Sequence, residues 1–123
     1  MTTILIESQH NLGWNGGVTM FDYSVVDRIV DRIVREFSPE MVIVFGSVAS
    51  HTAKSGSDVD LLIVMDTEED AIMRGVRVRM ALQDIIIDKD IIVVTPDEFE
   101  AKKDDEYSFI SEIVKTGYVV YEA

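Results

Sequence analysis

Apolar residues recur at helical spacing across residues 21–38, the pattern of an amphipathic helix with one face packed on a core. Charged residues occupy the opposite face of the same stretch. We expect Ser24 to cap the start of this helix, because a serine hydroxyl accepts hydrogen bonds from free backbone amides. Pro39 should end the helix near Ser38, since the residue before a proline disfavours helical backbone angles.

Further along the chain, short apolar stretches rich in β-branched residues predict three buried strands, at residues 41–45, 58–65 and within 85–94. Helices are predicted at residues 48–53, 67–83, from 96 onward and 105–116. Thr67 precedes acidic residues that suit a helix start, and Thr95 opens a capping box with proline at the first helical position. Gly117 should end the last helix before a terminal strand at 118–121. This order predicts an α/β fold with a mixed β-sheet of three to four strands flanked by helices.

Composition excludes several classes of protein. The length of 123 residues suits one domain, assigned to residues 21–123, with the glycine-rich residues 1–20 as an N-terminal arm. The absence of cysteine excludes disulfides and agrees with a cytoplasmic location. Apolar stretches are only one strand long, so no contact with a membrane is expected. The net charge of −12 argues against direct binding to nucleic acid, but not against a nucleotide that arrives with magnesium.

Candidate chemistry begins at Asp58 and Asp60, which open the second predicted strand. Residues two apart on a strand face the same side, about 6.6 Å apart along its axis, so both carboxylates can converge on divalent cations. Asp90 heads the third strand and joins them if the two strands are neighbours, as a general base or a further metal ligand. Asp88 lies on the same face and competes with Asp90. The plain alternative is a solvated strand start, because Asp-x-Asp pairs recur by chance in an aspartate-rich chain.

Gly46 and Ser47 follow the first predicted strand directly. Glycine lets the backbone approach a ligand closely, and the Ser47 hydroxyl can donate to phosphate. A strand-to-helix turn without a ligand explains the same two residues, so both interpretations stay open.

Together these motifs resemble the minimal, MNT-type nucleotidyltransferases of the DNA polymerase β-like superfamily. Gly46-Ser47, ten residues and then Asp58-Val59-Asp60 match the Gly-Ser-x10-Asp-x-Asp signature of that family. Asp90 corresponds to its third carboxylate, and the resemblance covers residues 21–123. It implies that Asp58 and Asp60 bind two magnesium ions, with Asp90 as the third carboxylate that assists the acceptor. It also implies that Gly46 and Ser47 hold the triphosphate of ATP.

Similar MNT proteins are antitoxins that silence HEPN-domain RNase toxins by transferring AMP from ATP to a toxin tyrosine. The resemblance therefore implies a protein adenylyltransferase that forms a hetero-oligomer with a HEPN toxin. Two alternatives remain: a non-catalytic binding antitoxin of the same fold, and an adenylyltransferase acting on a small hydroxylated molecule. The binding alternative is motivated by Val48 and Ser50, which stand where relatives commonly carry arginines; Lys54 can compensate.

Several other residues have less specific expectations. Relatives often carry glycine where His51 stands and an apolar residue where Lys89 stands; His51 is expected to be a surface histidine. A solvated helix face, with a nucleotide or partner contact as the alternative, is expected for Arg74, Arg77 and Arg79. Core packing is expected for Tyr107, Tyr118 and Tyr121.

Overall fold

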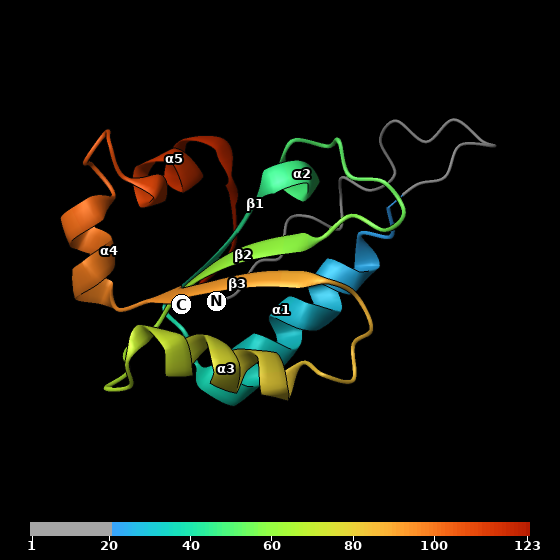
Figure 1. The fold of residues 1–123 in the computed structure, drawn as a ribbon, viewed down its shortest axis with the longest axis horizontal. Helices are drawn as coiled ribbons and strands as arrows, with labels where there is room; N and C mark the ends of the chain where they lie inside the picture. Colours follow the sequence, from blue (N-terminus) through green and yellow to red (C-terminus); the bar gives the residue numbers. More distant parts are fainter. Residues whose placement is uncertain (1–20) are drawn as a thin grey trace.

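The computed structural model describes residues 21–123, so the expected arm at residues 1–20 lies outside the described residues. The elements are α1 (Ser24–Phe37), β1 (Met41–Phe45), α2 (Gly46–Ala49), β2 (Val59–Val64), α3 (Ala71–Ala81), β3 (Lys89–Val94), α4 (Pro96–Lys102), α5 (Phe109–Thr116) and β4 (Tyr118–Glu122). They form one four-stranded sheet in the order β3-β2-β1-β4 (Figure 1). β2 and β3 are parallel, whereas β1 is antiparallel to both of its neighbours. The predicted α/β fold with a mixed sheet is confirmed.

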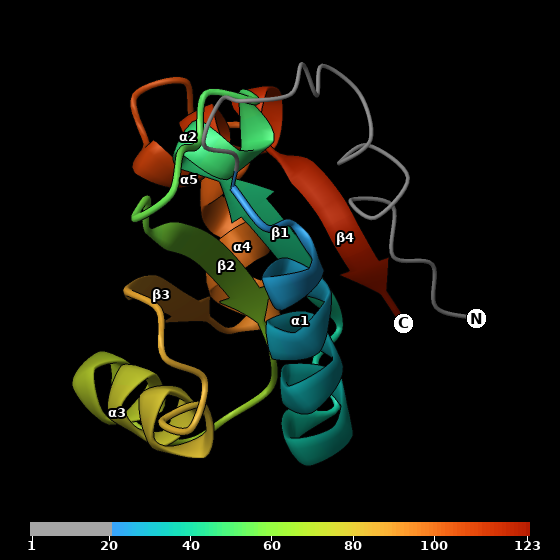
Figure 2. The same ribbon diagram turned by 90° about the vertical axis from the view of Figure 1, so that its right-hand side faces the viewer.

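One face of the sheet packs against α1 and α3 (Figure 2). The apolar stripe of α1 is fully buried there, at Val26, Ile29, Val30 and Ile33. Alternate strand residues meet it, among them Val44, Leu61 and Val93. This alternation follows from the two-residue period of strands, which sends every second side chain to the same face.

The opposite face packs against α4 and α5 through a smaller apolar cluster. Its members include Ile43, Leu62 and Val94 from the strands and Phe99 and Ile113 from the two helices. The cluster covers only part of this face, because the strand residues at one end of it are aspartates rather than apolar residues.

The predicted helix starts are corrected at several places. Tyr23, not Ser24, is the N-cap of α1 and makes no side-chain cap, while Asp22 Oδ1 accepts from the Ser24 amide at 3.0 Å. Residues 46–49, not 48–53, form α2. Asp70 rather than Thr67 caps α3 by accepting from the Met73 amide at 2.9 Å, so the helix starts later than predicted.

The second half of the chain follows the prediction with two shifts. The capping box at Thr95 and the helix end at Gly117 are confirmed. β3 starts only at Lys89, and α5 starts after Ser108, whose hydroxyl accepts from the Ser111 amide at 3.0 Å. Within residues 21–123, no helix has the length and apolar character needed to cross a membrane.

Candidate active site

The strand register places Phe45, Asp60 and Asp90 in one row across three strands. Phe45 pairs with Asp60 between the antiparallel β1 and β2, and Asp60 pairs with Asp90 between the parallel β2 and β3. The row lies where β1 ends and β2 and β3 begin, the end of the sheet that α2 occupies in Figure 1. Side chains directly opposite on neighbouring strands share one face of the sheet, so two of the predicted site carboxylates are neighbours. Asp58 directly precedes β2.

Asp60 is electrostatically coupled to both other carboxylates. Burial raises the pKa of Asp60 above its usual range, and the negative charges of Asp90 and Asp58 raise this pKa further. Within residues 21–123, none of the three carboxylates accepts a hydrogen bond or forms an ion pair. The site therefore carries negative charge that the described part of the protein leaves uncompensated.

Gly46 lies directly against Asp60. A Cβ atom added at Gly46 would overlap Oδ2 of Asp60 and lie 3.1 Å from its Cγ. The backbone of Gly46 also has a φ of +71°, a conformation that side chains disfavour. The glycine of the motif is thus required both by its backbone conformation and by the close approach of the carboxylate.

The Ser47 carbonyl organises the turn that follows. It accepts from the amides of Thr52 and Ala53 at 2.9 and 3.1 Å, which folds residues 47–53 back on themselves. The Ser47 hydroxyl makes no hydrogen bond to any residue of the described chain.

The donor set fits magnesium. All three candidate ligands are carboxylates, and magnesium prefers oxygen ligands, keeps waters and is often held by one or two carboxylates together with substrate phosphates. Among residues 21–123, no three acidic or histidine side chains are gathered closely enough to form a complete metal site. Like-charged carboxylates repel without a cation, so a bound cation would have to draw these side chains together.

Asp88 occupies a different place from Asp90. Its backbone carbonyl accepts from the Val59 amide at 2.9 Å, and its side chain is exposed before β3 begins. Asp60 pairs with Asp90 in the register, and the charge of Asp90 adds to the rise in the pKa of Asp60 that burial causes, whereas Asp88 has no such effect. The geometry therefore favours Asp90 as the third carboxylate.

The departures from the family pattern have local explanations. Val48 is fully buried in the core, and the Ser50 hydroxyl bonds to Thr52 Oγ1 at 2.8 Å. His51 has a φ of +62°, which explains why glycine suits this position. The exposed His51 ring lies 5.9 Å from that of Tyr118 and 6.2 Å from that of Tyr23, measured between centroids.

Lys89 is also used inside the chain, because its ammonium donates to the carbonyls of Ile85 and Ile87 at 2.6 and 2.9 Å. Lys54 is exposed in the loop before β2.

The expectation of a solvated helix face is wrong for Arg74 and correct for Arg77 and Arg79, which are exposed although all three are bonded within the chain. Arg74 is buried and pairs with Glu98 at 2.8 Å. Arg77 forms two hydrogen bonds with the carboxylate of Glu69, and Arg79 donates to the Ile91 carbonyl at 3.3 Å. These contacts hold α3 to the loop before it, to α4 and to β3.

The three tyrosines differ in burial. Tyr121 is buried and Tyr118 packs against the core, as predicted. The prediction is wrong for Tyr107, which is 91% exposed in the connection between α4 and α5. Two residues on, Phe109 is 59% exposed and packs edge-to-face on Phe45 of the carboxylate row. No motif signalled Phe109, because the packing of α5 against β1 brings its ring to Phe45.

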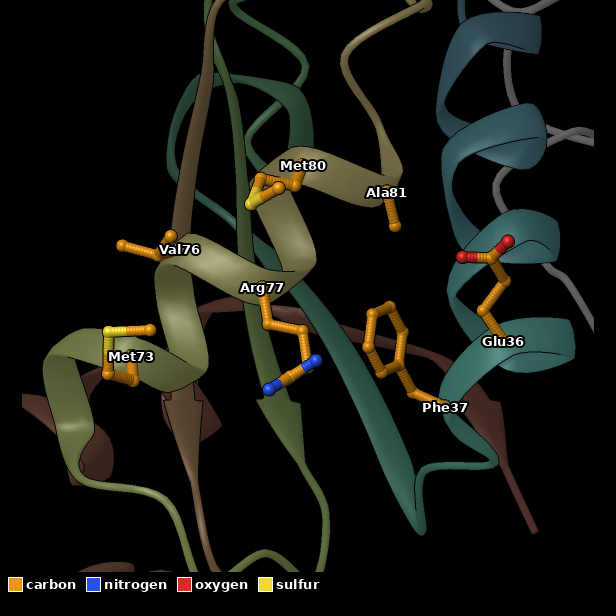
Figure 3. A pocket seen from close by; sticks show the side chains of 7 residues that line it. All are labelled: Glu36, Phe37, Met73, Val76, Arg77, Met80 and Ala81. Carbon is orange, nitrogen blue, oxygen red and sulfur yellow. The ribbon is translucent and has the colours of Figure 1, made fainter.

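A cavity of about 750 Å³ lies between α1 and α3, on the opposite face of the sheet (Figure 3). In the close-up, the Phe37 ring of α1 and the Arg77 side chain of α3 lie next to each other in this groove. Its lining is mainly apolar and includes Met73, Val76 and Met80. The groove contains none of the predicted site residues and is separate from the carboxylate row.

The fold and the site define a nucleotidyltransferase domain. Residues 27–123 match the family described as polymerase beta, nucleotidyltransferase, and the chain belongs to this family. A solved structure of a candidate nucleotidyltransferase from Sulfolobus solfataricus shares the fold, at 22% identity over 80% of this chain and 78% of that chain, with a TM-score of 0.53. A toxin–antitoxin structure with AMP-PNP is similar at 17% identity over 79% and 73%, with a TM-score of 0.56. No curated protein matches the sequence significantly.

Proposed function

We propose that the protein is a magnesium-dependent adenylyltransferase that transfers AMP from ATP to a tyrosine hydroxyl of a HEPN-domain RNase toxin, acting as its antitoxin. The observation that carries this proposal is the pairing of Asp60 with Asp90 beside Gly46 and Ser47. Membership of the nucleotidyltransferase family supports the reaction type. The likeness to a toxin–antitoxin structure with AMP-PNP supports the partner and the nucleotide.

In the proposed reaction, the tyrosine oxygen of the toxin forms a bond to the α-phosphorus of ATP. The bond from that phosphorus to the oxygen bridging to the β-phosphate breaks, and pyrophosphate leaves with its electron pair. Asp90 accepts the proton of the tyrosine hydroxyl, which makes the oxygen a better nucleophile. Magnesium bound by Asp58 and Asp60 would neutralise phosphate charge and polarise the α-phosphate.

The chain's own residues then have separate roles. Asp58 and Asp60 hold the cation, and the rigid contact between Gly46 and Asp60 fixes the distance from the carboxylate to the turn. The Ser47 hydroxyl donates to a phosphate oxygen of the nucleotide. Asp90 lies one strand away on the acceptor side, so ion binding and proton removal fall to different strands.

The test combines the protein, α-labelled ATP, magnesium and the product of the neighbouring gene. Label should move to a tyrosine of that product, and the Asp58→Asn/Asp60→Asn double variant should abolish the transfer. Asp88→Asn is the matched control, since Asp88 is exposed and, unlike Asp58 and Asp90, does not raise the pKa of Asp60, so this variant should retain transfer. Label transfer that survives the double variant contradicts the proposal.

A second candidate function is a binding antitoxin without catalysis, and burial of Val48 favours it. That position cannot offer a cation to a triphosphate, and the Ser50 hydroxyl is used within its own turn. In this case the aspartate double variant should still neutralise the toxin in cells, and depletion of ATP should change nothing. Loss of protection in the double variant, with complex formation intact, would exclude it.

A further inference from the structure

Phe109 exposes an aromatic ring beside the candidate site. It is the first residue of α5 and is 59% exposed, although it is a large apolar side chain. Its ring centroid lies 5.7 Å from that of Phe45, at an interplanar angle of 88°. Such an edge-to-face contact holds one ring in place while leaving surface of the exposed ring open to a ligand.

Phe45 connects the Phe109 ring to the carboxylate row. Phe45 pairs with Asp60 in the strand register and is followed directly by Gly46, whose backbone lies against the Asp60 carboxylate. Phe109 therefore packs on the apolar member of the same row that contains Asp60 and Asp90. A ligand whose phosphates lie at Ser47 and Asp60 would extend an aromatic group within reach of this ring.

The helix that presents Phe109 is firmly anchored. Ser108 caps α5 by accepting from the Ser111 amide at 3.0 Å, and Ser111 and Ile113 are buried. The Ser108 hydroxyl also donates to the Lys102 carbonyl at 2.7 Å, which ties the start of α5 to the end of α4. The exposed ring thus stands on a fixed backbone rather than on a long loop.

We propose that Phe109 is the stacking platform for the purine base of the nucleotide. This inference rests on the proposed function, because it assumes that the phosphates lie at Ser47 and Asp60. A phenylalanine ring offers an apolar face and no hydrogen-bonding group, so it stacks on a base without reading its edges. Loss of the ring should therefore weaken ATP and GTP binding to a similar extent.

The test measures binding of AMP-PNP with magnesium by calorimetry, with inorganic tripolyphosphate as a probe that lacks the base. Phe109→Ala and Phe109→Leu should weaken AMP-PNP binding by roughly 5- to 100-fold, the range of one lost base–aromatic stack. Both variants should bind tripolyphosphate as the unaltered protein does. Phe109→Trp should retain AMP-PNP affinity, because it keeps an aromatic face.

Two controls separate stacking from a change in the fold. Phe109→Leu keeps a large apolar side chain against Phe45. If its melting temperature equals that of the unaltered protein, the fold is intact, and a loss of AMP-PNP affinity comes from the loss of the aromatic face. Val114→Ala removes another exposed apolar side chain of α5, 42% exposed, and should leave nucleotide affinity unchanged.

The outcomes also separate this inference from the proposed function. Unchanged AMP-PNP affinity in Phe109→Ala, in a protein that still transfers AMP, overturns only the stacking role. An equal loss of AMP-PNP and tripolyphosphate affinity overturns it too, since the ring would then support the phosphate site instead. If the unaltered protein binds no AMP-PNP, the proposed function and the stacking platform both fail.

Discussion

The Asp60 carboxylate occupies the space that a side chain at Gly46 would need. Gly46→Ala should therefore displace Asp60 and lower AMP transfer at least tenfold, since a small misplacement at a reacting centre is costly. It should also destabilise the fold by more than the 1–2 kcal/mol or so that a left-handed backbone costs a non-glycine residue. Transfer assays and urea unfolding measure the two effects.

Gly56→Ala is the matched control for this prediction. Gly56 also has a positive φ, +90°, but an added Cβ there meets no atom within 4 Å. The variant should lose about 1–2 kcal/mol of stability for backbone strain and keep its transfer rate. Equal activity losses at both glycines would contradict the role given to the Gly46–Asp60 contact.

Asp60 should make stability depend on pH and on magnesium. Its pKa is raised in the folded protein from the usual 3.8, so the folded state holds its proton more tightly than the unfolded state. The free energy of unfolding should therefore fall as pH rises from about 4 through the raised pKa, and stay lower above it. Asp60→Asn should remove this fall in urea unfolding experiments with EDTA.

Magnesium should restore the stability lost to carboxylate repulsion at pH 7, because a ligand that binds only the folded state stabilises it. The increase should be absent in Asp58→Asn/Asp60→Asn and present in Asp88→Asn. A magnesium effect of the same size in the double variant would place the cation elsewhere.

Arg32 should keep Asp84 ionised down to about pH 2. Two hydrogen bonds, at 2.7 and 3.0 Å, join the Arg32 guanidinium to this carboxylate and lower its pKa to about 2. The stability that the pair contributes is present above pH 4 or so and is lost as pH falls toward 2. In Arg32→Gln, the pKa of Asp84 should return toward 3.8, as measured by an NMR titration.

Arg35→Gln is the control for this pair, since Arg35 contacts Asp31 at 2.8 Å on the exposed surface of the same helix. Exposed pairs one helical turn apart contribute little, so the pKa of Asp84 should not move. A shift of that pKa in Arg35→Gln would show that long-range charge, rather than the direct bond, sets it.

Arg74 should be the most important arginine of α3 for stability. Its side chain is only 10% exposed, pairs with Glu98 and donates to the Glu69 carbonyl at 2.7 Å. Arg74→Met should lower the free energy of unfolding by about 1–2 kcal/mol, because it removes two charge-assisted hydrogen bonds whose acceptors are partly exposed, so water can replace part of each bond. Arg79→Met, which removes one bond from an exposed side chain, should cost less in the same experiment.

The sequence predicted the elements whose local signals agree with their packing. The stripe of α1, the apolar β1 and the Thr95 capping box need only neighbouring residues to be recognised. For the motif residues Gly46 and Asp60, whose functional roles stay predictions, the structure adds the reason for the glycine: the two residues lie in close contact.

Features that depend on distant contacts were not predicted correctly. Thr67 and Asp70 are both suitable caps. Thr67 Oγ1 accepts from the Glu69 amide before the helix, whereas Asp70 caps α3 itself. The exposure of Tyr107 and the placement of Phe109 likewise depend on how α5 crosses the sheet. The sequence alone does not show whether such an aromatic side chain points into the core or toward solvent.

The register of β3 limits how the protein can evolve. Ile91 and Val93 face the core under α1 and α3, while Asp90 faces the other way beside Asp60. A slip of one residue would move both apolar side chains to the face that packs against α4 and α5, and would move Asp90 into the core under α1 and α3. Insertions and deletions are therefore tolerable in the connection at residues 82–88 only if they leave the register of β3 unchanged. A variant with a shifted register would lose core packing and the carboxylate row together, so selection for a stable fold also preserves the site.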